Sequence, residues 1–163
     1  MSIKTMDDLF VETLKDIYYA EKHILKAMPS MAKKAHASEL KKALESHRQE
    51  TEGQIERLEK VFEMLDVPAR GRKCEAIEGI LSEAKEHMKE IENEDVLDAS
   101  VIAFAQTIEH YEICRYGTLI EWGKDLGFND AVELLQQTLE QEKNDDRLLA
   151  QIARSTSHHP AAA

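Results

Sequence analysis

The spacing of apolar and polar residues predicts a chain built almost wholly of α-helices. Apolar side chains recur every three or four residues through most of the sequence, and no stretch alternates as a half-buried strand does. Only three prolines and six glycines interrupt this pattern. It predicts helices over residues of about 6–35, 39–66, 76–91, 96–127 and 129–154, followed by a frayed tail, residues 155–163, that carries His158 and His159.

Residues at the predicted helix ends indicate how the elements are connected. Thr5 with Asp8 forms a candidate capping box for the first helix, and Ser38 and Asn129 are candidate caps of the second and the last. The first two helices are joined so closely that they should be antiparallel neighbours. The clear loop is residues 66–75, DVPARGRKCE, and a shorter helix follows it. The sequence therefore predicts an all-α bundle of four long helices, with an extra short helix in the crossover between the second and the third.

Acidic residues interrupt the apolar face of the helix predicted over residues 96–127. At helical spacing, one stripe contains Ile102, Ala105, Glu109, Glu112, Tyr116 and then Leu119 or Ile120. Burying an uncompensated charge costs several kcal/mol per ion. The stripe therefore predicts either a hydrated face or a cation that lies against it.

Polar side chains also interrupt the stripes of the other long helices: Glu21 in the first; His47, Gln54 and, on the flank, Glu50 in the second; Glu142 and Asp145, with Asp146 as a second candidate for the latter position, in the last. In a four-helix bundle these groups meet at one level of the core. Six carboxylates there would repel one another, and either protonation of some of them or a pair of divalent cations would relieve the repulsion. Oxygen-rich ligation favours iron or manganese over zinc or copper.

Each of these residues also has an ordinary structural interpretation. A single acid in a stripe can reflect a face misjudged by one residue, and Glu50 and Asp146 can be solvated at a stripe edge. His47 on an apolar face is more often a core histidine than a ligand. Tyr18 and Tyr116 are typical packing residues, although both fall near the level of the acids and could donate hydrogen bonds to them. Two helices that each carry an acid pair at i and i+3 favour the metal site.

Composition excludes several other classes of protein. The 163 residues fit one domain, and 42% hydrophobic with 33% charged residues is typical of a globular chain. A net charge of −11 repels phosphate backbones and anionic lipids, so we expect neither nucleic acid nor membrane as a partner. The N-terminal residues lack the features of a secretory signal, and the two cysteines are far apart, so we expect a cytoplasmic protein. No catalytic triad or phosphate-binding loop is present, and the sequence assigns no catalytic residue.

Several segments resemble the YciF-like stress-protein family, a branch of the ferritin-like superfamily: DIYYAEKHILKAMPSMAKKA, HRQETEGQIERLEKVF, RKCEAIEG and LLQQTLEQEKNDDRLL. The resemblance extends from about Asp7 to Ala153. It implies a ferritin-like four-helix bundle with an added crossover helix, a homodimer and a link to bacterial stress responses. It also implies a dinuclear metal centre related to that of rubrerythrins.

The resemblance implies one metal-binding acid in each long helix: Glu21, Glu50, Glu109 and Glu142. In the wider superfamily a histidine follows the glutamate by three residues in the second and fourth helices. In this sequence those positions hold Gly53 and Asp145. His47 and Gln54 lie one turn on either side of the second-helix acid and could replace the missing histidine, and Glu112 is an additional acid. A set with more carboxylates and fewer imidazoles favours harder ions.

Two functions follow from these expectations. In the first, the chain binds two iron ions, or manganese, and reacts with oxygen or peroxide as an oxidase or peroxidase. Glu50 and Glu142 would bridge the ions, and Tyr18 and Tyr116 would lie around the ligands. In the second, the chain is a non-catalytic acidic helical dimer, a stress-response interaction module whose metal site is vestigial or structural. A thermal melt with and without metal distinguishes them.

Overall fold

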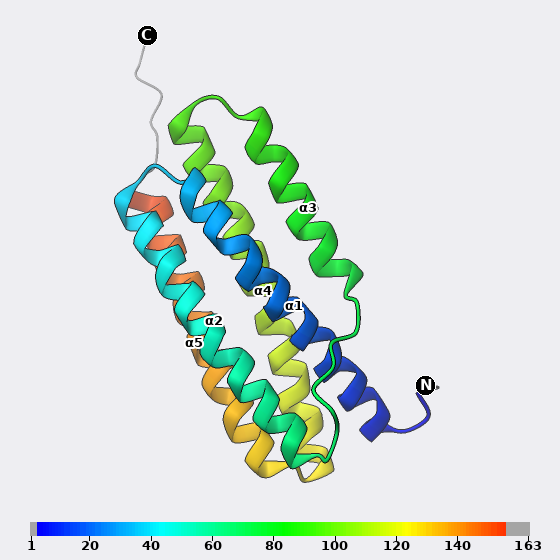
Figure 1. The fold of residues 1–163 in the computed structure, drawn as a ribbon. Helices are drawn as coiled ribbons and strands as arrows, with labels where there is room; N and C mark the ends of the chain where they lie inside the picture. The colour runs from blue at the N-terminus through cyan, green and yellow to red at the C-terminus, as the bar shows by residue number, and fades with distance from the viewer. Residues whose placement is uncertain (1–2, 156–163) are drawn as a thin grey trace.

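The protein is an all-α bundle. The computed structural model describes residues 3–155, and within them the regular secondary structure is helical. The helices are α1 (Met6–Lys34), α2 (Ser38–Met64), α3 (Glu75–Glu90), α4 (Glu94–Leu126) and α5 (Asn129–Ser155). The four long helices lie side by side, and the shorter α3 lies outside them in the crossover from α2 to α4 (Figure 1). This is the architecture that the apolar pattern predicts.

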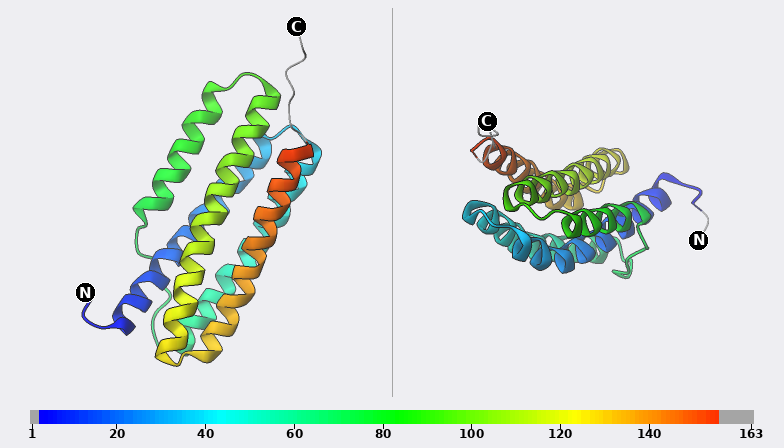
Figure 2. Two further views of the ribbon diagram at one scale, coloured as in Figure 1. Left: turned by 180° about the vertical axis from the view of Figure 1, so that it is seen from behind. Right: turned by 90° about the horizontal axis from the view of Figure 1, so that it is seen from above.

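Each long helix packs against two others, so the four enclose one core. Helix α1 contacts α2 and α4, and α5 contacts the same two helices, while α3 packs on α1 and α4 (Figure 2). The inward faces carry the large buried apolar side chains, among them Phe10, Leu14, Ile17, Ile24, Leu40, Leu44, Leu58, Phe62, Ile108 and Leu119. Because every inward stripe meets two neighbouring helices, a polar residue in a stripe is held among groups from several elements.

Side-chain caps fix the starts of α1 and α4. Thr5 Oγ1 accepts a hydrogen bond from the backbone N–H of Asp8 at 3.1 Å, and Asp8 Oδ2 accepts one from the N–H of Thr5 at 3.1 Å, which confirms the capping box. Asn93 Oδ1 accepts from the N–H of Val96 at 3.0 Å. Helix α4 therefore begins at Glu94 rather than at residue 96.

Two other helix ends differ from the sequence prediction. Ala37, rather than Ser38, is the residue that precedes α2, and no side chain of this end caps the helix. Helix α2 ends at Met64 rather than at residue 66, since Asp66 has the positive φ of 53° that stops a right-handed helix. Ser155 is the last residue of α5, and the rest of the predicted tail, including His158 and His159, lies outside the described residues.

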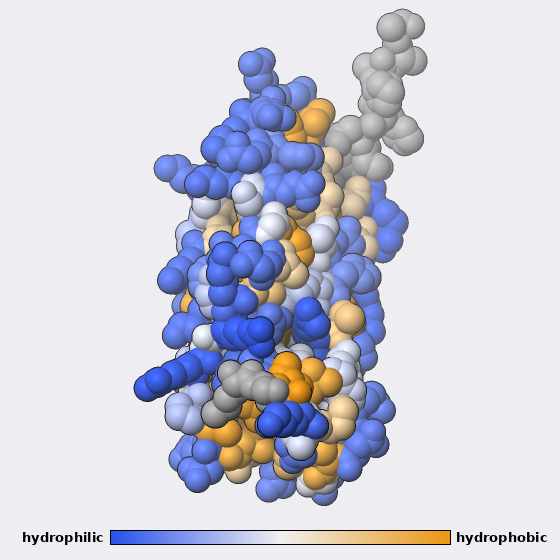
Figure 3. Space-filling model, turned by 90° about the vertical axis from the view of Figure 1, so that its right-hand side faces the viewer, coloured by the Kyte–Doolittle hydropathy of each residue, from blue (hydrophilic) through white to orange (hydrophobic). Residues whose placement is uncertain are grey.

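The surface is mostly hydrophilic on the side that carries α3 and the start of α1, with hydrophobic side chains gathered toward the N-terminal end (Figure 3). None of the described helices is both long enough and apolar enough to cross a bilayer.

Candidate metal centre

Four carboxylates and one histidine lie buried at one level of the core. Glu21 on α1, Glu109 and Glu112 on α4 and Glu142 on α5 are each 0% exposed, and His47 on α2 is 3% exposed. Each of them occupies a position of the apolar stripe of its helix. The same helical period that builds the core therefore turns these polar groups inward.

His47, Glu109, Glu112 and Glu142 are close enough to share a metal ion. Each offers one ligand atom, and these atoms all lie within 4.8 Å of one another. His47 Nδ1 is 2.8 Å from Glu109 Oε1, and His47 Nε2 is 3.9 Å from Glu142 Oε2. The shorter contact is not a hydrogen bond, and Glu109 Oε1 is left without a hydrogen-bond partner. Two adjacent ligands of one octahedral ion lie about 3 Å apart, so this separation suits shared coordination.

Unpartnered polar atoms are concentrated at this level. Among the described residues, nine buried side-chain oxygen or nitrogen atoms have no hydrogen-bond partner. They belong to Glu21, His47, Gln54, Glu109, Glu112, Glu142 and Asp145. A buried polar atom without a partner costs about 1–3 kcal/mol, so native interiors contain few of them. Nine that converge in one place indicate a group that binds them, and carboxylate oxygens with an imidazole nitrogen are ligands of a divalent cation.

Two neutral side chains hold the carboxylates in place. The Tyr116 hydroxyl on α4 donates a hydrogen bond to Glu21 Oε1, and Gln54 Nε2 on α2 donates one to Glu142 Oε1. In both glutamates the second oxygen, Oε2, lacks a partner. Such hydrogen bonds orient the carboxylates that ligate metals in other proteins.

Burial raises the pKa of every carboxyl in this group. It raises the pKa of Glu21 to about 8, together with the charge of Glu142, and it raises the pKa of Glu109 to about 8, where the charge of Asp145 adds to it. The pKa values of Glu112 and Glu142 lie well above the usual range, because of burial first and the neighbouring carboxyls second. Without a cation, these groups therefore hold protons at neutral pH, and a bound divalent ion would displace them.

Glu50 and Asp145 lie at the edge of the buried group. Both are half-buried, and neither belongs to the set of ligand atoms within 4.8 Å of one another. Burial raises the pKa of Asp145 to about 6, with a smaller rise from the charge of Glu50, and the charge of His47 opposes both. The structure thus brings His47, rather than Glu50, from α2 into the buried set.

Asp146 and Tyr18 make contacts elsewhere. Asp146 accepts a hydrogen bond from Gln106 at 2.9 Å and lies 3.3 Å from the Nε2 atom of His110. The Tyr18 hydroxyl donates to Glu59 at 2.7 Å. Of the two tyrosines that the sequence singles out, the structure therefore places only Tyr116 at the acids.

The sequence analysis missed two residues beside the site, Ala43 on α2 and Leu148 on α5. Both line a small pocket of about 10 Å³ whose wall also contains His47, Glu109 and Asp145. Small and apolar residues on a helix carry no chemical signal, so only the packing of α2 against α5 could reveal them.

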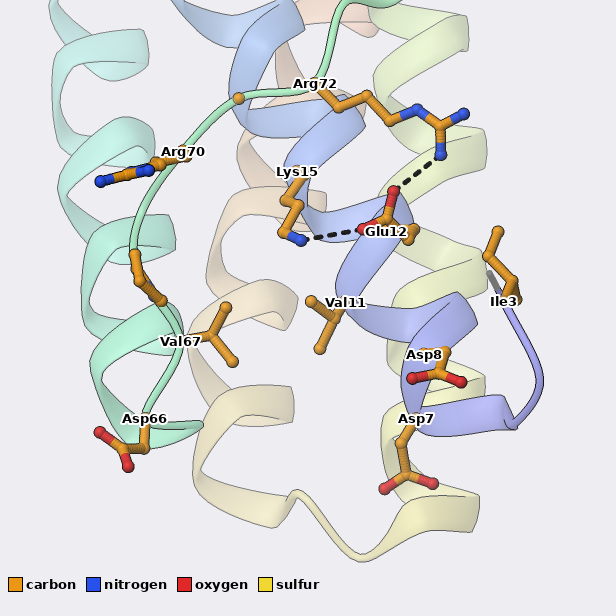
Figure 4. Close-up of a pocket in the computed structure, with 12 residues that line it drawn as sticks. Ile3, Asp7, Asp8, Val11, Glu12, Lys15, Asp66, Val67, Arg70 and Arg72 are labelled. Carbon is orange, nitrogen blue, oxygen red and sulfur yellow. Dashed lines mark hydrogen bonds and ion pairs between the residues drawn. The ribbon is translucent and has the colours of Figure 1, made fainter. Parts of the chain in front are cut away.

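A larger pocket lies away from this chemistry. It has a volume of about 910 Å³ and lies between the start of α1 and the loop after α2 (Figure 4). Its acid Glu12 is neutralised by Lys15 Nζ at 2.8 Å and by Arg72 Nη1 at 2.7 Å. None of its lining residues belongs to the buried group of His47 and the glutamates, so the larger pocket is not the candidate metal centre.

Comparison with known proteins gives full-length relatives. Residues 5–162 match the family described as "Domain of unknown function (DUF892)". Protein YciF of Escherichia coli (strain K12) is 41% identical over 154 residues, which cover 94% of this chain and 93% of YciF. The chain belongs to the YciF-like family. The crystal structure of the E. coli stress protein YciF matches the fold of this family member with a TM-score of 0.91 at 40% identity, over 94% of this chain and 98% of that one.

Two further solved structures share the fold of this YciF-like protein. YcfI from Rhodopseudomonas palustris matches with a TM-score of 0.90 at 47% identity, over 91% of this chain and 95% of that one. A protein from Xanthomonas campestris matches with a TM-score of 0.74 at 20% identity, over 92% and 91% of the two chains, and supports the fold alone. The five-helix architecture is thus that of the family, and the buried group of histidine and glutamates could hold a metal ion.

Proposed function

We propose that this YciF-like protein is a metalloprotein whose bundle core holds a carboxylate-rich dinuclear iron centre, with manganese as the alternative metal. The observation that carries the proposal is the convergence of nine unpartnered buried polar atoms from α1, α2, α4 and α5. The proposed ligands are Glu21, His47, Glu109, Glu112 and Glu142, while Asp145 lies at the edge of the group and outside the set of close ligand atoms. Glu50, which the family resemblance implies as a bridging ligand, is not among them, because it is only half-buried and lies outside the group.

Charge balance supports a pair of ions over a single one. Four fully buried glutamates carry four negative charges when they are ionised. Two divalent ions supply four positive charges, and the neutral imidazole of His47 adds a ligand without adding charge. One divalent ion would leave about two carboxylates uncompensated in a medium where each unpaired charge costs several kcal/mol.

The protein groups around the proposed centre suit controlled reaction with a small oxidant. Bound iron would supply one-electron chemistry toward oxygen or peroxide. Tyr116 holds Glu21, and Gln54 holds Glu142, so the carboxylates are oriented before any ion arrives. The raised carboxyl pKa values mean that these side chains take up and release protons near neutral pH. We further propose that this activity belongs to a stress response, as the description of E. coli YciF as a stress protein suggests.

The second candidate is a non-catalytic role as an interaction module. The relative from Rhodopseudomonas palustris is described as a candidate structural protein, which favours this role. In that case the buried carboxyls would stay protonated, and metal ions would leave the melting temperature unchanged, whereas an ion that binds only the folded state raises it. The homodimer and the cytoplasmic location expected from the sequence remain predictions.

Anaerobic titration with Fe²⁺ tests the proposed centre. We expect about two ions per chain in the natural protein and a marked loss of bound iron in the double variant Glu109→Gln/Glu142→Gln, since it removes two charged ligands. Glu140→Gln is the matched control, because Glu140 lies on the same helix, is exposed and pairs with Lys143. Unchanged stoichiometry in the double variant would contradict the proposed ligands. An absorbance change on admission of oxygen would support the oxidase or peroxidase reaction, and its absence with iron bound would favour a structural role for the metal.

A further inference from the structure

Two pockets between α2 and α5 share lining residues and lie in line from the surface toward the buried acids. The outer one is a groove of about 590 Å³ lined by Glu39, Lys42, Ser46, Gln151, Ile152 and Ser155. The inner one is the small pocket of about 10 Å³ beside His47, Glu109 and Asp145. Ala43 and Leu148 line both pockets, so they stand at the boundary between them. Helices α2 and α5 pack directly on each other along this seam (Figure 2).

Leu148 is the solvent-exposed side of this boundary. Leu148 is 40% exposed, whereas Leu44 and Leu149, which also line the inner pocket, are 1% and 3% exposed. A fully packed core leucine cannot change rotamer without disturbing its neighbours, but a leucine that faces solvent on one side can. Ala43 on the opposite helix has no side chain beyond Cβ to fill the space that such a change would open.

The size and the lining of the inner pocket suit an ion. A space of about 10 Å³ holds roughly one water-sized particle, which excludes an organic substrate. Three of its side chains are metal-ligand types, and Oδ2 of Asp145 is buried without a hydrogen-bond partner. Asp145 is half-buried, while Glu109 beyond it is fully buried, so the ligand groups continue from the groove into the core. The charges of Glu39 and Lys42 offset each other at the mouth, and the nearby Glu50 adds negative charge beside Asp145.

We propose that divalent metal ions reach the buried centre through this passage, with Leu148 as its gate and Asp145 as the transient first ligand that passes the ion to His47 and Glu109. A cation that enters a protein exchanges its waters for oxygen ligands stepwise, and a half-buried carboxylate at the boundary provides the first exchange. The inference rests on the proposed metal centre, and it adds the route and the residues that control the rate of loading.

The rate of anaerobic Fe²⁺ uptake tests the passage, with free Fe²⁺ captured at timed intervals by a fast chromogenic chelator. Leu148→Ala widens the boundary and should load several-fold faster than the natural protein. Leu148→Trp fills it and should load about tenfold more slowly, since each factor of ten in rate needs only ~1.4 kcal/mol of added barrier. Asp145→Asn should also load more slowly. The final number of ions per chain should be unchanged in all three, because none of the proposed permanent ligands is altered.

Val96→Phe is the matched control, because Val96 is 53% exposed on α4 and lines neither pocket. Opposite rate changes from two substitutions at one position cannot come from a general loss of stability. Equal rates in both Leu148 variants, with iron still bound, would overturn the passage and leave the metal centre in place. A lower final stoichiometry in Asp145→Asn would overturn the transient role of that residue. No iron bound by the natural protein would overturn the metal centre and the passage with it.

Discussion

At each of four core positions the chain has a glutamate where an apolar residue would stabilise the bundle more. Replacing buried ionic groups by hydrophobic residues of similar volume is often neutral or stabilising. Glu21, Glu109, Glu112 and Glu142 are nevertheless fully buried, and six of their eight carboxyl oxygens, together with one more from Asp145, find no hydrogen-bond donor among the described residues. Proteins keep such destabilising groups where function requires them.

Glu112→Gln should reveal this conflict between stability and function. The folded metal-free protein holds Glu112 protonated, whereas the unfolded chain ionises it, so folding is penalised at neutral pH. The neutral amide removes that penalty, and we expect the metal-free variant to have a higher melting temperature than the natural protein at neutral pH. The gain in melting temperature on addition of Mn²⁺ should be lost. Thermal melts with and without Mn²⁺ measure both effects.

Glu121→Gln is the control for that substitution, because Glu121 lies on the same helix, is exposed and pairs with Lys124. A metal-free Glu112→Gln protein that melts below the natural one would contradict the account of the buried charge.

His47→Gln tests the one imidazole of the group. Even residues that only support metal ligands change metal affinity by roughly 10–100-fold, so loss of a direct ligand should weaken Mn²⁺ binding by at least about tenfold. Isothermal calorimetry measures the affinity. His110→Gln, which alters an exposed histidine 3.3 Å from Asp146, should leave it unchanged. Equal affinities in the two variants would show that His47 is a structural core residue and not a metal ligand.

Helical periodicity was sufficient to predict the burial of three glutamates of α4 and α5, but neither the half-buried position of Asp145 nor the choice within α2. Glu109, Glu112 and Glu142 lie within stripes bounded by apolar residues, so any bundle turns them inward. His47 and Glu50 lie three residues apart, about 60° around the helix axis, and both can face the core. Only the rotation of α2, set by its packing on α1 and α5, decides that His47 enters the buried group and Glu50 stays at the edge.

At the scale of elements, a third buried acid of α4, near the start of the helix, links α4 to the connection between α1 and α2. Asp98 is 5% exposed and accepts hydrogen bonds from the backbone N–H groups of His36 and Ala37, at 2.6 and 2.7 Å. These residues form the connection between α1 and α2. The carboxylate of α4 thereby binds the backbone of the two residues directly before α2 and fixes this connection.

Asp98→Ala should therefore destabilise the fold more than an ordinary surface change. Two hydrogen bonds to a charged acceptor are lost and two backbone donors are left without it, so we expect the free energy of unfolding to fall by ~2–4 kcal/mol. Denaturant unfolding measures the change. Asp125→Ala, near the other end of α4 and exposed, should cost less than about 0.5 kcal/mol. Similar losses in both variants would contradict the role of Asp98.

The caps show why local sequence signals predict some helix ends and not others. The capping box of Thr5 and Asp8 is complete within four residues, so the sequence alone could predict it. Ser38 was the expected cap of α2. Instead, the backbone N–H groups of His36 and Ala37, just before the helix, bind Asp98, which lies 62 and 61 residues away in the sequence. A contact of that sequence separation follows from the tertiary fold and leaves no local pattern.

At the scale of the whole molecule, the buried carboxyls link stability to pH. In the metal-free protein, the pKa values of Glu21 and Glu109 are raised from the usual 4.5 to about 8. Between these values the folded chain holds protons that the unfolded chain has released. The free energy of unfolding of the metal-free protein must therefore fall as pH rises through that window.

Thermal melts at pH 5 to 8 test this linkage. The metal-free protein, kept so by a chelator, should have its melting temperature lowered steadily as pH rises. Bound Mn²⁺ replaces the protons, so the melting temperature of the loaded protein should be level or rise over the same range. Parallel curves with and without Mn²⁺ would show that the ion does not reach the buried carboxyls.

Anomalous X-ray diffraction at the iron edge, from crystals loaded anaerobically with Fe²⁺, tests the central claim most directly because it locates the ions. We predict two anomalous peaks in the bundle core, both among His47, Glu109, Glu112, Glu142 and Glu21. Iron peaks confined to surface carboxylates, with the core glutamates paired to one another through shared protons, would contradict the metal centre.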